Sequence, residues 1–149
     1  MHDFKQFPEL TNAQMDLYYF ESPHKQITTD FRAKCTKVHD GDTITLNWED
    51  RDFEFPVRFL NINAFELNED GGHQTRDWLK DKIEGQEVDI RIDPKNRVDK
   101  WGRLLGAVSH AGLDMGEWML RDGRVTTFES RNEGKIPSID KTLAVKQWF

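Results

Sequence analysis

Residues 38–66 read VHDGDTITLNWEDRDFEFPVRFLNINAFE. The stretch opens with an acidic turn, Asp40-Gly-Asp-Thr43, and continues with alternating apolar and polar residues as far as Trp48. A charged loop then leads to a second apolar run, which ends in Asn63-Ala-Phe-Glu66. Alternation with a period of two is typical of strands that bury one face. The stretch therefore predicts two neighbouring antiparallel strands with acidic residues at their ends.

The acidic turn is a hairpin signal, and we expect Gly41 to supply the positive φ that such turns require. Upstream, alternation over about residues 27–38 predicts a strand that contains Cys35. Three antiparallel strands in succession form a meander. For the third strand, over 53–62, we expect two faces, one with Phe53, Phe55, Val57 and Phe59 and the other with Arg58, Leu60 and Ile62.

The remaining chain mixes helices and strands. We expect a helix over 73–84 that ends at a left-handed Gly85, strands over 88–92 and 104–108, and a helix from an Asp114 N-cap to Gly123. An extended piece over 124–128 and a final helix over 138–148 follow. The fold class is α+β, with about three helices. Five short strands must remove their edges, so an OB-fold-like β-barrel is the simplest closure.

Residues 1–30 form an N-terminal extension to the barrel domain, which spans 31–149. Thr11 and Gln14 make a capping-box pattern, which predicts a short helix over about 12–20. Its apolar stripe either covers the domain's own core or docks a protein partner, and we favour the first interpretation. The apolar residues of this stripe are Ala13, Leu17 and Phe20.

Composition limits the class of protein. A chain of 149 residues suits one domain, and its lone Cys35 cannot form an internal disulfide, so we expect it to pack in the core. No apolar run approaches the roughly 20 residues that span a bilayer, and the first residues show no secretory signal. We therefore expect a protein without a membrane partner, either cytoplasmic or incorporated in a larger assembly such as a virion.

The net charge of −6 argues against indiscriminate binding of nucleic acid, which normally needs a broad basic surface. The charge is unevenly distributed, however: residues 31–90 sum to −6, whereas residues 91–149 sum to +3. An acidic middle followed by a basic last third fits a metal site that faces a phosphate site. It equally fits an ordinary solvated surface.

Residues that bind cations or anions recur at predicted strand ends and turns. Taken singly, the acids fit turn chemistry and the arginines fit salt bridges or solvated loops. Taken in order, they form a set that holds a hard cation against a phosphate. The set comprises Asp40, Asp42, Arg58, Asn63, Ala64, Glu66 and Arg103.

The order of these motifs resembles the staphylococcal nuclease (thermonuclease) family. Its members carry a DGDT turn, an arginine in the third strand followed by an acidic segment, and a DK-aromatic-GR motif, which here occupies residues 99–103. The resemblance extends over roughly residues 31–128. It implies an OB-type barrel and a calcium-dependent phosphodiesterase that cuts DNA and RNA to leave 3′-phosphate ends.

The resemblance also implies a role for each matching position. Asp42 would supply a calcium carboxylate and Ala64 a backbone carbonyl, with Asp40 as a nearby acid. Glu66 occupies the position of the general base. Arg58 and Arg103 match the phosphate-binding arginines, while the residues near the terminal phosphate would be Lys100 and Trp101.

Two departures from the family pattern bear on activity. Asn63 stands where the family has a calcium-binding aspartate, so the site loses one negative charge, and we expect weaker affinity for Ca²⁺ or a changed preference for another divalent cation. The family's paired tyrosines are missing after Gly123, where Phe128 is the nearest aromatic residue. Trp101 either replaces them as a stacking platform or covers the end of the barrel.

Two functions therefore remain open from the sequence. The leading hypothesis is a metal-dependent nuclease with DNA or RNA as substrate. The alternative is a weakened or inactive nuclease-like module that binds or assembles, with residues 1–30 docking to a larger complex. The five histidines show neither an i,i+4 pair nor a Cys/His cluster, which weighs against a zinc enzyme.

Overall fold

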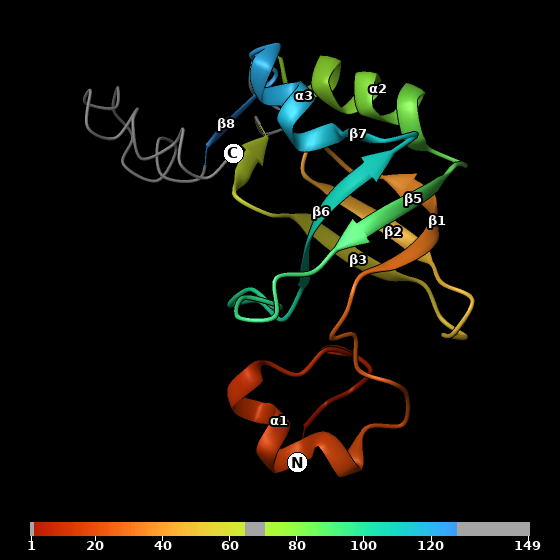
Figure 1. Cartoon of the computed structure of the whole chain (residues 1–149), viewed down its shortest axis with the longest axis vertical. Helices are drawn as coiled ribbons and strands as arrows, with labels where there is room; N and C mark the ends of the chain where they lie inside the picture. The colour runs from red at the N-terminus through yellow and green to blue at the C-terminus, as the bar shows by residue number, and fades with distance from the viewer. Residues whose placement is uncertain (1, 65–70, 128–149) are drawn as a thin grey trace, which may run out of the picture.

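The computed structural model describes residues 2–64 and 71–127 (Figure 1). A short 3-10 turn, Tyr19–Glu21, follows the first helix. The helices are α1 (Asn12–Tyr18), α2 (Gly72–Ile83) and α3 (Met115–Arg121). The strands are β1 (Phe31–Val38), β2 (Thr43–Asn47), β3 (Phe55–Phe59), β4 (Ile62–Ala64), β5 (Glu87–Arg91), β6 (Leu104–His110), β7 (Leu113–Asp114) and β8 (Val125–Thr127).

Five of the strands close into a barrel, in the order β3-β2-β1-β5-β6, because β3 also pairs with β6. The first three strands are antiparallel neighbours, as the meander prediction requires, whereas β3 and β6 run parallel. Closure leaves no open edge between these five strands, which confirms the predicted OB-like α+β fold. The short strands β4 and β8 form a separate antiparallel pair beside the barrel.

The core consists of the inward-facing residues of the barrel together with the buried sides of α2 and α3. Its members include Cys35, Leu46 and Val57, each with no exposed surface. Cys35 is a free buried thiol, which confirms its predicted packing role. Burying an aliphatic side chain of this kind stabilises a fold by about 1.5–3 kcal/mol. In Figure 1, α2 and α3 cover one end of the barrel, and α1 lies beyond the other end.

The single strand expected over 53–62 is wrong in detail. It breaks at Asn61, whose φ of 64° turns the chain and starts β4. Because of this turn, Ile62 joins Val57 and Phe59 in the core instead of lying on the opposite face. The expected positive φ at Gly41 is also wrong, since its backbone lies outside that region. Glycine is needed at position 41 because the turn packs closely against Thr75 and Ala64.

The capping box at the start of α1 is present, with Thr11 Oγ1 accepting from Gln14 N. The prediction that the stripe of α1 covers the core is wrong: Leu17 is 72% exposed and Phe20 is 96% exposed. The extension is instead anchored by its flanks, where Leu10 and Ile27 are buried. The predicted final helix over 138–148 lies outside the described residues.

At the other helices the local signals hold. Asp114 caps α3 by accepting from Glu117 N, and Gly85 follows α2 with a φ of 84°. None of the helices within residues 2–64 and 71–127 combines the length and the apolar character that a membrane crossing demands.

Candidate functional site

The acidic turn between β1 and β2 lies directly against β4 and α2. A Cβ built on Gly41 would stand 2.5 Å from Thr75 Cγ2 and 2.9 Å from Ala64 Cβ, so only glycine fits this approach. The close contact places the buried Asp42 carboxylate beside β4, where Asp42 Oδ2 accepts from Ala64 N at 2.7 Å. Asp42 Oδ1 accepts from Thr43 Oγ1 at 2.9 Å. The turn therefore presents a fixed, hydrogen-bonded carboxylate.

Asp40 is the second acid of this turn. Its Oδ1 accepts from Asp42 N at 3.0 Å, which folds the two acidic residues toward one another. Burial, together with the hydrogen bond and negative charge of Asp42, raises the pKa of Asp40 to about 6. Two carboxyl groups that crowd one another in this way resist being ionised together. Their excess negative charge is what a cation or guanidinium would offset.

Arg58 approaches the turn from β3. Its Nη1 donates to the carbonyls of Phe59 at 2.7 Å and Ile62 at 2.6 Å, and its Nη2 donates to Asn63 Oδ1. The same Nη2 lies 3.3 Å from Asp42 Oδ2. Arg58 thus holds the turn between β3 and β4 closed while it neutralises part of the acidic charge.

The environment of Arg58 shows which charges meet here. Burial lowers the pKa of Arg58, and the positive charge of Arg103 lowers it further, whereas Asp42, Asp40 and Asp99 act in the opposite direction. All four of these charged groups are therefore close enough to influence Arg58. The fold brings together residues that the sequence separates by up to 63 positions, from Asp40 to Arg103.

Arg103 is held differently from Arg58. Its Nε donates to Asp99 Oδ2 at 2.8 Å, and its side chain is 32% exposed. Among residues 2–64 and 71–127, neither Nη group of Arg103 has a hydrogen-bond acceptor. Asp99 also accepts at Oδ1 from the backbone N–H groups of Trp101 and Arg103. Asp99 therefore fixes the conformation of the loop and orients the Arg103 guanidinium, whose two Nη groups have no acceptor among the described residues.

Lys100 and Trp101 form the outer edge of the site. Trp101 is 59% exposed, so it does not close the barrel end as a buried cover. Lys100 Nζ lies 4.5 Å from the centre of the Trp101 ring, and the Arg103 guanidinium lies 5.2 Å from the same centre. An exposed aromatic ring with cations beside it is a combination found where single-stranded nucleic acids bind.

Eight of the nine predicted site residues cluster at one end of the barrel or on the adjoining loop: Asp40, Asp42, Arg58, Asn63, Ala64, Lys100, Trp101 and Arg103. The ninth, Glu66, lies outside the described residues. Within the described ranges, no group of three or more His, Cys, Asp or Glu side chains could hold a metal ion. The acids that the structure describes at this point are the pair Asp40 and Asp42.

Comparison with known proteins adds to this geometry. The family model described as staphylococcal nuclease homologue matches residues 56–146, more than half of the chain. The chain belongs to the staphylococcal nuclease family. A nuclease-like function is thereby supported. Two relatives, from Escherichia coli O157:H7 and from Escherichia coli, carry the name "Uncharacterized endonuclease". Each is 29% identical over 132 residues, which cover 88% of this chain and 82% of the relative.

Sequence reasoning missed the role of Asp99, although an acid followed three residues later by glycine is a turn signal that could have indicated it. It also missed a buried ionic cluster of Glu9, Arg51 and Arg97, which no local pattern marks. These three residues are far apart in the chain, so only the fold shows that they meet.

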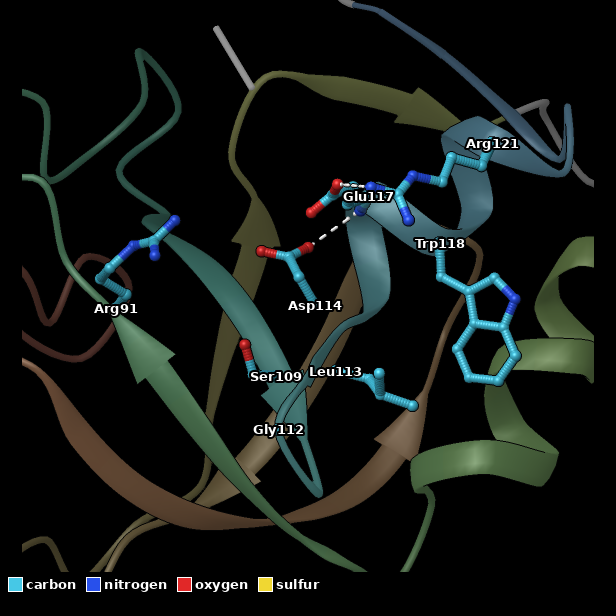
Figure 2. A pocket seen from close by; sticks show the side chains of 8 residues that line it. All are labelled: Arg91, Ser109, Gly112, Leu113, Asp114, Glu117, Trp118 and Arg121. Atoms are coloured by element: carbon cyan, nitrogen blue, oxygen red, sulfur yellow. Dashed lines mark hydrogen bonds and ion pairs between the residues drawn. The ribbon is translucent and has the colours of Figure 1, made fainter.

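A hollow of about 640 Å³ lies elsewhere, between β5, β6 and α3 (Figure 2). Its acids are used by the helix itself, because Asp114 accepts from Glu117 N and Glu117 pairs with Arg121. In Figure 2, Arg91 lies apart from these acids, whereas Ser109 is the strand partner of Asp114. The polar groups of this hollow therefore support α3 and converge on no common point.

Proposed function

We propose that the protein is a metal-dependent nuclease that hydrolyses phosphodiester bonds of DNA or RNA. The observation that carries the proposal is an acidic turn with Arg103 nearby, whose two Nη groups have no acceptor among the residues that the structure describes. A phosphodiester is anionic and gains charge as water attacks, so a fixed guanidinium beside it stabilises the transition state. Family membership and the two endonuclease-named relatives support the same reaction class.

The donor set fits a hard cation such as Ca²⁺ in part. Asp42 supplies a buried carboxylate and Asp40 a half-buried one, and Ala64, whose N–H donates to Asp42 Oδ2, would add its carbonyl oxygen. Asn63 fits less well, since its Oδ1 already accepts from Arg58 Nη2. We propose that Asp42, Ala64 and Asp40 hold the cation. When bound, it would neutralise negative charge on the phosphodiester.

Three side chains then bind the phosphate, hold the site together and accept a proton. Arg103 binds a phosphate oxygen through its free Nη groups. Arg58 adds positive charge and keeps Asn63 and Asp42 in place, because its own donors are used on β3 and β4. Glu66, at the position that the family resemblance assigns to the general base, takes the proton from the attacking water. Such a base accelerates hydrolysis by about 10²–10⁴-fold.

A digestion assay on plasmid and single-stranded substrates, with calcium, magnesium or a chelator, tests the proposal. We expect cleavage that the chelator abolishes, and a loss of about 10²-fold or more in Glu66→Gln and Arg103→Ala. Lys95→Ala, at an exposed turn, is the matched control and should cut normally. Cleavage that persists in chelator, or full activity in both site variants, would contradict the proposal.

A nuclease-like binding module is the second candidate. The observation in its favour is Asn63. This neutral residue stands where the family has a metal-binding carboxylate, and its Oδ1 accepts a hydrogen bond from Arg58 Nη2. The same assay separates the two functions. Intact protein that binds single strands but leaves every substrate uncut with each cation would identify the module.

A further inference from the structure

A cleft of about 490 Å³ separates the N-terminal extension from the loop that precedes β6. Its volume falls in the range of pockets that hold small ligands. The extension contributes His2, Phe7 and Tyr18, and the loop contributes Lys100, Trp101 and Gly102. The cleft thus begins where the phosphate-binding loop of the proposed nuclease ends, one residue before Arg103.

The two walls touch at one point. A Cβ on Gly102, whose φ is 84°, would stand 2.6 Å from Phe7 Cδ1, so the Phe7 ring rests directly on the backbone of the loop. Next to this contact, the rings of His2 and Tyr18 lie 5.8 Å apart. Aromatic side chains therefore line one wall, and the exposed Trp101 ring lines the other.

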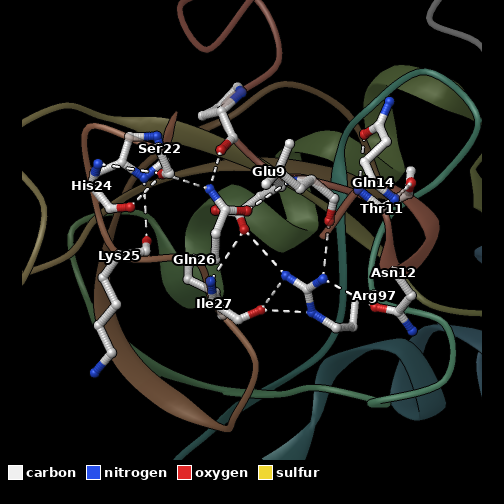
Figure 3. Close-up of polar contacts among 12 residues, drawn as sticks. Glu9, Thr11, Asn12, Gln14, Ser22, His24, Lys25, Gln26, Ile27 and Arg97 are labelled. Carbon is white, nitrogen blue, oxygen red and sulfur yellow. Dashed lines mark hydrogen bonds and ion pairs between the residues drawn. The ribbon is translucent and has the colours of Figure 1, made fainter. Parts of the chain in front are cut away.

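The extension is held firmly in this place by the segment that joins β5 to β6 (Figure 3). Arg97 Nη2 and Nε donate to Ile27 O at 2.6 and 2.8 Å, and Nη1 donates to Leu10 O at 3.0 Å. Glu9 lies between Arg97, at 3.4 Å, and Arg51, at 2.5 Å, with all three side chains buried. The joining segment is thus fastened to the extension at Arg97 and again at Gly102.

The cleft places the Lys100 ammonium next to an aromatic ring, and its lining also holds the acids Asp3, Glu9 and Asp99. Lys100 has no carboxylate partner within the described part of the chain, and its ammonium lies over Trp101. Asp99 is engaged by the loop and Arg103, and Glu9 by two buried arginines. Asp3 accepts from the backbone N–H groups of Lys5 and Gln6. A nucleobase has a π-face that stacks on such rings, and it carries its phosphate with it.

We propose that this cleft binds an unpaired nucleobase of a single-stranded nucleic acid, with the base between Trp101 and Tyr18 and the adjoining phosphate near Lys100 and Arg103. The inference rests on the proposed nuclease function and extends it. The extension then supplies a stacking surface that the barrel domain alone does not contain. A base within a duplex is stacked on both faces, so the cleft selects single strands.

Binding of a fluorescein-labelled phosphorothioate oligothymidylate, measured by anisotropy in calcium and again in chelator, tests the cleft. We expect Tyr18→Ser and Trp101→Ala to weaken binding roughly fivefold or more, with Trp101→Phe retaining most of it. Tyr19→Ser is the matched control: Tyr19 is 51% exposed and is not among the residues that line the cleft, so binding should be unchanged. Thermal unfolding of each variant verifies that it is folded.

Binding by Tyr18→Ser equal to that of the unaltered protein would overturn the proposal, as would equal losses in Tyr18→Ser and Tyr19→Ser. Absence of binding by the unaltered protein in both conditions would also overturn it. Hydrolysis of bis(p-nitrophenyl) phosphate, a diester without a nucleobase, reports on the nuclease function separately. If this diester is not cut but the oligonucleotide binds through Tyr18, the nuclease proposal fails and the cleft stands.

Discussion

At the scale of single residues, two arginines of the same motif set have different environments. Arg58 is buried and uses its donors on carbonyl and amide oxygens, whereas Arg103 is partly exposed and its Nη groups have no acceptor in the part of the chain that the structure describes. The local sequence describes both as arginines near acids. Their neighbours decide that one holds the site together and that the other is available to a phosphate.

Asn63→Asp should raise the affinity for calcium. The change restores a carboxylate next to Asp42, and calcium affinity rises with the number of charged ligands. Isothermal titration calorimetry with calcium measures the effect, and Asn47→Asp, at an exposed strand position, provides the control. Equal affinities for Asn63→Asp and the unaltered protein would show that residue 63 does not face the ion.

Cys35 should react slowly with a disulfide reagent while the protein is folded. Burial raises the pKa of its thiol to about 11, with a smaller contribution from the charge of Glu84. A raised pKa keeps the thiol protonated at pH 8, and the thiolate is the reactive form. Absorbance after addition of the reagent, with and without urea, measures the rate. A folded protein that reacts as fast as the urea-treated one would contradict the burial of Cys35.

At the scale of elements, the break at Asn61 has the largest effect on the site. A continuous strand over 53–62 would have carried Asn63 and Ala64 away from the acidic turn. The turn redirects the chain into β4, whose Ala64 N–H then reaches Asp42. Gly41 makes room for this approach. The site is therefore built where a hairpin turn and a short strand end meet.

Asp114→Ala should destabilise the protein by about 1 kcal/mol, the usual cost of losing an N-cap. Asp114 Oδ1 accepts from Glu117 N at the start of α3, which buries Met115 and Met119 in the core. Urea denaturation followed by circular dichroism measures the change. Asp50→Ala, at an exposed loop position, is the control, and an equal midpoint for the two variants would refute the capping role.

At the scale of the whole molecule, the N-terminal extension is part of the folded unit. Its helix contributes no buried residue, but its flanking segments are tied to the barrel domain: Glu9 pairs with Arg51 and Arg97, and the carbonyls of Leu10 and Ile27 accept from Arg97. Gln26 accepts from Leu10 N at 2.7 Å, which joins the two ends of the extension to one another. The extension is thereby fixed beside the loop that carries Arg103.

Glu9→Gln should destabilise the protein by about 3–5 kcal/mol, because it leaves two buried guanidiniums without their shared counter-charge. The stability is measured by urea denaturation. Glu49→Gln, at an exposed position, is the matched control, and surface changes of this kind usually stay within about 0.5 kcal/mol. A similar small effect for Glu9→Gln would show that the ionic cluster is not needed to hold the extension.

Much of the barrel could be predicted because its signals are local. Alternation identified β1, β2 and β5, and capping residues identified the starts of α1 and α3. The predicted conformation of Gly41 and the continuous third strand were wrong because both depend on what packs against them. Thr75 and Ala64 leave no room for a side chain at position 41, and the burial of Ile62 stabilises the break at Asn61.

By itself, the sequence determined the meander, most of the strands along the chain, and the set of acids and arginines on which the proposed nuclease site is built. These properties follow from periodicity, turn chemistry and residue type, and each of these can be recognised from residues that are close together in the sequence. Only the tertiary structure decided which guanidinium is free, where the extension lies and which charges share the interior. Those features depend on contacts between residues that are distant in the chain. The strength of these contacts depends on burial, which exists only once the barrel has closed.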